Sequence, residues 1–203
     1  MFTGIVQGVG KVVRVLKKDH FQQYTVKFPK NLLIPKIQVG MSISNNGCCL
    51  SVTKTENNEI SFDLIRKTLE MTNFGNVQVG DLINLERSIR FGDEIGGHLM
   101  SGHIFTIAKI IKISKSKNNL IISLSPKKIE SMNYILETGF IGIDGISLTV
   151  GKVLKKSFHI NLIPETIRST NISKRKIDDF VNVEIDPYTQ SIVETTKRIM
   201  QKK

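Results

Sequence analysis

The chain contains two copies of one sequence pattern, offset by 98 residues. Without any gap, 12 of the 40 positions from 47 to 86 are identical to the residues 98 places later, whereas ordinary composition would give roughly three. The turn Asn46-Gly47 aligns with Asp144-Gly145 in this comparison. A duplication of this kind predicts two similar modules of about 90 residues each.

Each copy is made of short segments with strand character. They cover residues 5–16, 22–28, 49–55, 59–64 and 82–86 in the first copy, and 104–113, 120–124, 146–153, 158–163 and 181–185 in the second. Only short helical pieces are expected, at 66–73, 128–137 and 167–171. Five or six strands in about 90 residues, with no long helix between them, are typical of a small antiparallel barrel. The sequence predicts an all-β chain of two tandem barrels, residues 1–97 and 98–187.

The last residues, 188–203, have a different pattern. Ile192, Val193, Ile199 and Met200 fall on one face of a helix, and basic residues gather near its C-terminal end, where they suit the helix dipole. A helix of this length is marginal alone in water. We therefore expect it to pack on its own barrel or on a partner subunit, and the pattern leaves both open.

The composition argues against several kinds of partner. The formal net charge is +11, but the lysines are scattered and aromatic residues make up only 6%. Because single-stranded nucleic acids are bound in basic grooves that carry aromatic stacking residues, we expect no nucleic-acid partner. No apolar stretch is long enough to span a membrane, and the first residues lack the pattern of a secretory signal.

The two cysteines, Cys48 and Cys49, are adjacent. Neighbouring strand residues point to opposite faces, so a disulfide between them is not expected. Their spacing also does not suit a zinc site. Two free thiols favour a reducing compartment, and we expect a cytoplasmic protein.

The two copies differ at several polar positions. Ile5 of the first copy aligns with His103, Cys49 aligns with Ser147, and a serine aligns with Asp186. One copy thus offers a thiol, and the other an imidazole, a hydroxyl and a carboxylate. A duplicated binding module that has diverged in this way can hold two similar molecules in different chemical settings, which suits a dismutation.

Histidine is the side chain best suited to moving protons in both directions near neutral pH. His103 is expected at the mouth of the second barrel, where Asp186 could orient it or act as the base. His98 is five residues away and would point to the opposite face of a shared strand, so no metal site is expected. The loop glycines serve either tight turns alone or the close approach of a ligand to the backbone; they are Gly4, Gly47, Gly102 and Gly145.

Several motifs carry a resemblance to a known family. They are MFTGIV at residues 1–6, NGCCL at 46–50, GDEIGGHLMSGH at 92–103, GFIGIDGISLT at 139–149 and LIPET at 162–166. Over essentially its whole length the chain resembles the riboflavin synthase alpha-chain family, whose members form two tandem six-stranded Greek-key barrels and a C-terminal helix that joins three chains.

The resemblance implies a reaction as well as a fold. Two molecules of 6,7-dimethyl-8-ribityllumazine would give riboflavin and 5-amino-6-(D-ribitylamino)uracil by transfer of a four-carbon unit, a step of riboflavin biosynthesis that needs no metal or cofactor. It implies a site between the N-terminal barrel of one subunit and the C-terminal barrel of its neighbour, and an association with lumazine synthase.

The resemblance also implies site residues. Those implicated in catalysis would be Cys49, His103, Ser147, Asp186, Ser42 and His98. Those that contact substrate would be Gly4, Ile5, Val6, Cys49, Leu50, Ser51, Asp63, Leu64, Ile65, Arg66, Lys67, Thr68, Gly102, His103, Ile104, Ser147, Leu148, Thr149, Ile163, Pro164, Glu165, Thr166, Ile167 and Arg168. Thr138 stands where the family usually has lysine, so a charged contact to the ligand would be missing, and Ser51 stands where threonine is commoner.

Two other functions fit part of the pattern. A non-enzymatic lumazine- or flavin-binding protein would share the fold, but such relatives tend to lose the polar residues of one barrel, and this chain keeps a full set in both. A flavin-binding reductase domain would need a nicotinamide-binding domain, which the sequence does not contain.

Overall fold

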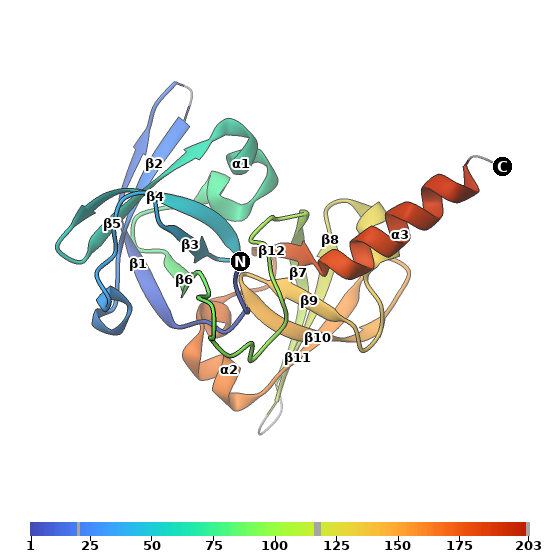
Figure 1. Cartoon of the computed structure of the whole chain (residues 1–203). Coiled ribbons are helices and arrows are strands. Elements are labelled where there is room, and N and C mark those ends of the chain that lie inside the picture. The colour runs from blue at the N-terminus through green and yellow to red at the C-terminus, as the bar shows by residue number, and fades with distance from the viewer. Residues whose placement is uncertain (20, 116–118, 202–203) are drawn as a thin grey trace.

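The computed structural model describes residues 1–19, 21–115 and 119–201, and it shows two barrels side by side with one long helix at the C-terminal end (Figure 1). The first barrel is closed in the order β1-β2-β5-β4-β3-β6, with every neighbouring pair antiparallel. Its strands are β1 Gly8–Lys17, β2 Phe21–Lys27, β3 Ser42–Asn45, β4 Cys48–Glu56, β5 Glu59–Ile65 and β6 Leu82–Arg87.

The second barrel repeats this arrangement with the order β10-β11-β8-β7-β12-β9. Its strands are β7 Thr106–Lys115, β8 Leu120–Pro126, β9 Phe140–Ile143, β10 Ile146–Val153, β11 Phe158–Leu162 and β12 Phe180–Ile185. In both barrels the second strand lies beside the fifth, and the sixth closes the barrel between the first and third, which is a Greek-key connection. The predicted fold class, two tandem six-stranded antiparallel barrels with a C-terminal helix, is confirmed.

Two strands were absent from the pattern expected in the sequence. β3 and β9 have four residues each, too few for an alternating pattern to stand out. The first strand of each copy begins later than expected, because residues 5–7 and 104–105 precede β1 and β7. Of these residues, Val6 and Ile104 pack on the core of the other barrel.

The helical pieces are short. α1 spans Arg66–Met71 and α2 spans Pro164–Ser169, each followed by a 3-10 turn at Asn73–Asn76 or Asn171–Lys174. α2 begins three residues earlier than expected, because Pro164 suits the first helical turn. Two further 3-10 turns lie at Lys30–Leu33 and Ile129–Tyr134, so the helix expected at 128–137 is a 3-10 turn.

Each barrel has its own hydrophobic core, filled by alternate residues of its strands. In the first, Tyr24 packs against Phe62 and Phe74 with ring centroids 5.5 and 5.2 Å apart. The second is almost entirely aliphatic around Phe158. Fully burying one such side chain contributes about 1.5–3 kcal/mol. Two residues cross over: Ile104 belongs to the first core, and Val6 packs against the second.

The barrels meet across an internal two-fold relationship. Phe2 and Met100, which are equivalent in the repeat, exchange two backbone hydrogen bonds of 2.8 and 2.9 Å. Gly47 and Gly145 touch backbone to backbone, since a Cβ on Gly47 would lie 2.7 Å from the Gly145 nitrogen. Both have positive φ, so these turns require glycine for conformation and for space.

α3 spans Pro187–Met200 and projects from the second barrel (Figure 1). The Asp186 side chain caps it by accepting a 2.8 Å hydrogen bond from the Thr189 backbone. Val193 packs against the second core, whereas Ile192 and Met200 remain exposed. One side of the helix thus packs on its own barrel, and the other side carries exposed apolar side chains. Residues 202–203 lie outside the described part.

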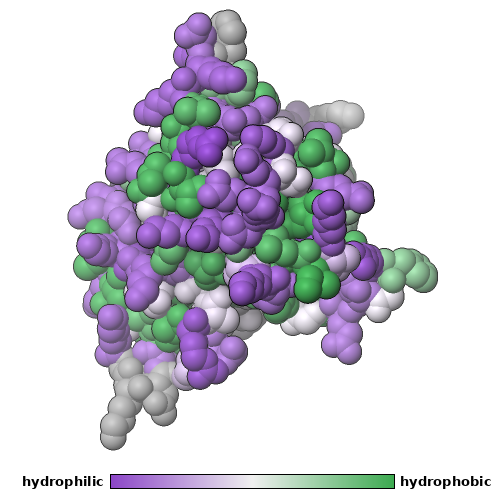
Figure 2. All heavy atoms as spheres, turned by 90° about the vertical axis from the view of Figure 1, so that its left-hand side faces the viewer, coloured by the Kyte–Doolittle hydropathy of each residue, from purple (hydrophilic) through white to green (hydrophobic). Residues whose placement is uncertain are grey.

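None of the helices in the described residues is long and apolar enough to cross a membrane. Figure 2 shows that hydrophilic side chains cover much of the first-barrel face, with apolar side chains in several separate areas between them.

Candidate functional site

The predicted residues of the first barrel form a patch on its outer wall. On β4 the side chains alternate, so Leu50 is buried in the core while Cys49 and Ser51 face outward. Ser42 on β3 lies opposite Ser51 in the sheet register. The predicted residues at the end of β5 continue the wall, and there Asp63 and Ile65 are exposed on either side of the buried Leu64.

A second patch lies at the equivalent place on the second barrel. Ser147 and Thr149 on β10 face outward, and Leu148 points into the core. Ile163 is exposed after β11, followed by the predicted residues on α2. The position equivalent to Ser42 is Phe140, which is 55% exposed, so this wall has an aromatic ring where the first has a hydroxyl. Sequence reasoning did not select Phe140, although its alignment with Ser42 could have indicated it.

Four predicted contact residues cannot present a side chain freely to a ligand. Leu64 is fully buried, and Leu50, Leu148 and Ile104 are less than a tenth exposed. They support the walls from inside, and only their backbone is available. On α1 and α2, Arg66 pairs with Glu70 and Arg168 pairs with Glu165 on the exposed surface, where ion pairs contribute little stability.

The loops that flank the patches are exchanged between the barrels. The Gly102 carbonyl accepts a 2.8 Å hydrogen bond from the Cys49 N–H, and the Gly4 carbonyl accepts one of the same length from the Ser147 N–H. Gly102 of the second copy therefore borders the first barrel, and Gly4 of the first copy borders the second. His103, expected at the mouth of the second barrel, instead follows the loop that lies against the first.

His103 is exposed and borders a cavity of about 440 Å³. The cavity lies at the junction of the two barrels and the start of α3; its other lining residues are Met71, Ser101, Ile104, Phe105, Lys128, Ile185, Pro187 and Gln190. From the sequence, Asp186 could orient His103 or act as the base itself; in the structure its carboxylate hydrogen-bonds Thr189. Asp186 accepts two hydrogen bonds of 2.8 Å from Thr189 and so serves as the cap of α3.

His98 is the histidine at the centre of the second patch. Its Nδ1 lies 2.7 Å from the Ser147 hydroxyl oxygen, and its ring stacks on Phe140 at a centroid distance of 5.0 Å. Burial lowers the pKa of His98, and the Asp186 carboxylate acts in the opposite direction. A largely neutral imidazole beside a hydroxyl can accept or return a proton.

The two thiols differ in availability. Cys48 lies in the first core, where burial and then the charges of Cys49 and Glu184 raise its pKa to about 12. Cys49 is half-buried on the outer wall. Since the thiolate is the reactive form, Cys49 is the thiol that this site can use.

Thr138 stands just before β9 with a φ of +64°. Its counterpart in the first copy is Gly40, with a φ of +88°, and the two make equivalent backbone hydrogen bonds to Val150 and Val52. A β-branched residue is strained in this conformation. The departure from the family pattern at Thr138 therefore has two consequences: a strained backbone at this position and the loss of the lysine charge.

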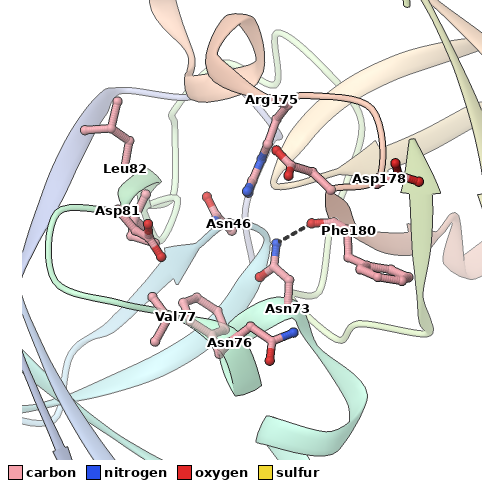
Figure 3. Close-up of a pocket in the computed structure, with 12 residues that line it drawn as sticks. Asn46, Asn73, Asn76, Val77, Asp81, Leu82, Arg175, Asp178 and Phe180 are labelled. Carbon is pink, nitrogen blue, oxygen red and sulfur yellow. Dashed lines mark hydrogen bonds between the residues drawn. The ribbon is translucent and has the colours of Figure 1, made fainter. Parts of the chain in front are cut away.

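The cleft between the barrels, of about 350 Å³, contains none of the predicted residues (Figure 3). Arg175 reaches into it toward Asn46 and Asn73 and pairs at 2.5 Å with the buried carboxylate of Asp144. Burial opposes the charge of Arg175, but Asp144 and other nearby carboxylates raise its pKa. We assign this polar network to holding the barrels together.

Comparison with known proteins agrees with the two-barrel repeat. The family model of the lumazine binding domain matches twice, at residues 3–88 and 101–186. Riboflavin synthase of Escherichia coli (strain K12) is 50% identical over 200 residues, covering 98% of this chain and 93% of the relative. Riboflavin synthase of Buchnera aphidicola subsp. Schizaphis graminum is 46% identical and covers 100% and 97%.

The chain belongs to the riboflavin synthase family. A solved structure, LumP complexed with 6,7-dimethyl-8-(1'-D-ribityl) lumazine, superimposes with a TM-score of 0.83 at 28% identity, covering 92% of this chain and 99% of that one. The lumazine-binding repeats of the riboflavin synthase family are the two barrels described above.

Proposed function

We propose that this protein converts two molecules of 6,7-dimethyl-8-ribityllumazine into riboflavin and 5-amino-6-(D-ribitylamino)uracil. The observation that carries the proposal is the pair of equivalent outer-wall patches with different chemistry. One has the Cys49 thiol, and the other has Ser147 hydrogen-bonded to His98. One molecule can thus be held as donor and the other as acceptor of the four-carbon unit. Near-full-length relatives named riboflavin synthase support this reaction.

The residues that we assign to the reaction fall into two groups. Around the first barrel, Cys49, Ser42 and His103 would act on one molecule. Around the second, His98 and Ser147 would handle protons on the other, and Asp186 would act through its charge on His98. The remaining predicted contact residues would hold the flat rings and the ribityl chains through hydroxyls, backbone groups and exposed apolar side chains.

We further propose that the working enzyme is a homotrimer. The two patches lie on the outer walls of different barrels, and the outward face of α3 leaves Ile192 and Met200 exposed at 67% and 72%. Three chains joined through α3 would bring the N-terminal barrel of one, residues 1–97, against the C-terminal barrel of another, residues 98–187. We also propose a cytoplasmic location, which the two free cysteines favour, and an association with lumazine synthase, which the family resemblance implies.

The test is direct. Purified protein is incubated with 6,7-dimethyl-8-ribityllumazine, and riboflavin is followed by its fluorescence while both products are quantified by chromatography. One riboflavin and one pyrimidinedione for every two lumazines consumed is the expected stoichiometry. Tight binding of lumazine without any riboflavin would instead identify a lumazine-binding protein of the same fold.

A further inference from the structure

Two glutamates at equivalent positions of the repeat are buried with a loop wrapped around each. Glu86 on β6 accepts hydrogen bonds from the Thr3 N–H at 2.6 Å, the Thr3 hydroxyl at 2.8 Å and the Gly4 N–H at 3.0 Å. Each glutamate is only 2% exposed. A buried carboxylate with three donors, two of them from the backbone, fixes the loop conformation closely.

Glu184 on β12 makes the same contacts in the second copy. It accepts hydrogen bonds from the Ser101 N–H at 2.6 Å, the Ser101 hydroxyl at 2.8 Å and the Gly102 N–H at 3.1 Å. The Ser101 hydroxyl oxygen in turn accepts a 3.1 Å hydrogen bond from the His103 N–H. The carboxylate therefore holds the backbone of His103 through one intervening hydroxyl.

Each loop then contacts the other barrel. Gly102, held by Glu184 of the second barrel, accepts the hydrogen bond from Cys49 of the first. A Cβ on Gly102 would lie 2.5 Å from the Cys49 Cβ, so the two residues are in close contact. Gly4, held by Glu86 of the first barrel, is similarly close to Ser147 of the second, because a Cβ on Gly4 would lie 2.6 Å from the Ser147 Cβ.

We propose that Glu86 and Glu184 are crossed positioning residues, each setting the geometry of the reactive group on the opposite barrel. Glu184 positions Cys49 and His103. Glu86 positions Ser147, whose hydroxyl in turn holds His98. Neither glutamate touches substrate in this arrangement.

The electrostatics agree with a crossed arrangement. Burial raises the pKa of both glutamates, although the hydrogen bonds from the loops act in the opposite direction. The charge of Glu184 also acts on Cys48, next to Cys49, in the first barrel. The charge of Glu184 therefore acts across the barrel junction.

The experiment uses two reporters that do not require turnover. Glu184→Gln and Glu86→Gln are prepared in the full chain, and each variant is the matched control of the other. The rate of iodoacetamide alkylation at Cys49, located by mass spectrometry, reports on the first barrel. The titration of the His98 imidazole, followed by NMR, reports on the second.

The expected pattern is crossed. Glu184→Gln changes the Cys49 alkylation rate several-fold and leaves the His98 titration as in the parent protein, whereas Glu86→Gln shifts the His98 titration and leaves Cys49 unchanged. Effects confined to each glutamate's own barrel, effects of both variants on both reporters, or no effect on either would overturn the proposal.

Milder variants keep the test decisive if either glutamine variant fails to fold. Ser101→Ala and Thr3→Val leave both carboxylates in place and remove only the hydroxyl link, so they separate positioning from the charge of Glu184. Ser101→Ala should change the Cys49 alkylation rate and Thr3→Val should shift the His98 titration, each by less than the corresponding glutamine variant. If both variants fold and neither effect is seen, the proposal is overturned.

A kinetic measurement then connects the geometry to the proposed function, on which only this step rests. Glu184→Gln should lower kcat by about 10- to 100-fold with a much smaller change in KM, because misplacing reactive groups by about 1 Å can cost that much. An unchanged kcat would overturn the catalytic part. If the parent protein forms no riboflavin, the proposed function fails, while the two reporters still test the positioning.

Discussion

The Nδ1 atom of His98 lies 2.7 Å from the hydroxyl oxygen of Ser147, on a ring that stacks against Phe140. The side chain is 6% exposed, and its Nε2 has no hydrogen-bond partner among the described residues. Charging this ring would place an unmatched N–H donor in a buried position, which accounts for its preference for the neutral form.

This arrangement predicts a pH dependence of stability. The pKa of His98 in the folded protein is lowered from 6.5, chiefly by burial, so the unfolded chain binds the proton more readily. The free energy of unfolding is therefore unaffected by His98 above about pH 6.5 and falls as the pH drops from there through the lowered folded pKa. Urea unfolding of the parent and of His98→Asn, from about pH 5 to about pH 8 so that the ordinary histidine pKa is bracketed, measures how the difference in their free energies of unfolding changes with pH.

Asparagine is the matched replacement because its side chain can still hydrogen-bond Ser147 but does not titrate. As the solution becomes more acidic, the free energy of unfolding of the parent should fall relative to that of His98→Asn. Glu86 and Glu184 have raised pKa values and so contribute the opposite trend, but they are common to both proteins and cancel. Parallel curves for the two proteins would show that His98 is not held neutral by the fold.

A second prediction concerns Cys49. Cys49→Ser keeps a hydrogen-bonding group on the outer wall but loses the thiol, so kcat should fall about tenfold or more while lumazine affinity changes little. Cys48→Ala is the control, since Cys48 is buried in the first core: it should cost about 1 kcal/mol of stability and leave kcat unchanged. Equal activity of Cys49→Ser and the parent would make the thiol a packing residue.

A third prediction follows from the backbone at Thr138. Thr138→Asn should raise the free energy of unfolding by about 1 kcal/mol, because asparagine tolerates a positive φ better than a β-branched residue. Gly40→Thr is the mirror control. A Cβ there has no neighbour within 4 Å, so any loss of stability reports conformation and not a clash. Thermal unfolding of the two variants should move in opposite directions.

The barrels could be predicted because the alternation of apolar residues along each strand is a local pattern, and because the 98-residue repeat appears when the sequence is aligned with itself. The crossing of the loops could not. Alternation tells which face of a strand is buried, but Ile104 and Val6 lie outside the strands and pack on a neighbouring barrel that the sequence does not identify. For the same reason the sequence did not indicate that the loop before His103 lies against the first barrel. Glu86 and Glu184 were visible as an identity in the repeat, yet nothing local indicated that their carboxylates would be buried.

A fourth prediction tests the role of α3. Deleting residues 188–203 should reduce both assembly and activity in sedimentation and turnover measurements, because an outward apolar face would be lost. Ile192→Gln removes apolar area from that exposed face, whereas Val193→Ala weakens packing on the chain's own barrel. Ile192→Gln should therefore affect assembly more than the stability of the single chain, and Val193→Ala the reverse. A truncated chain that still sediments as a trimer with full turnover would contradict the assignment.

The last prediction uses the repeat as its own control. Asp144 is completely buried and its Oδ2 is bound by Arg175, while its Oδ1 accepts hydrogen bonds from the Asn182 N–H and the Asn73 side chain at 2.8 and 3.0 Å. The equivalent places in the first copy hold Asn46 and Val77, which need no charge. There the Asn46 Oδ1 binds the Asn84 N–H at 2.8 Å and the Asn171 side chain at 3.1 Å.

The first copy therefore shows a neutral solution to the same geometry. Arg175→Val alone leaves a buried carboxylate without its cation and should cost about 3–5 kcal/mol. Adding Asp144→Asn should recover most of that loss, because the asparagine keeps the Oδ1 hydrogen bonds and removes the charge that needed a partner. Chemical denaturation of the two single variants and the double variant measures the coupling. If the losses simply add, the ion pair is not the reason these two residues differ from their counterparts.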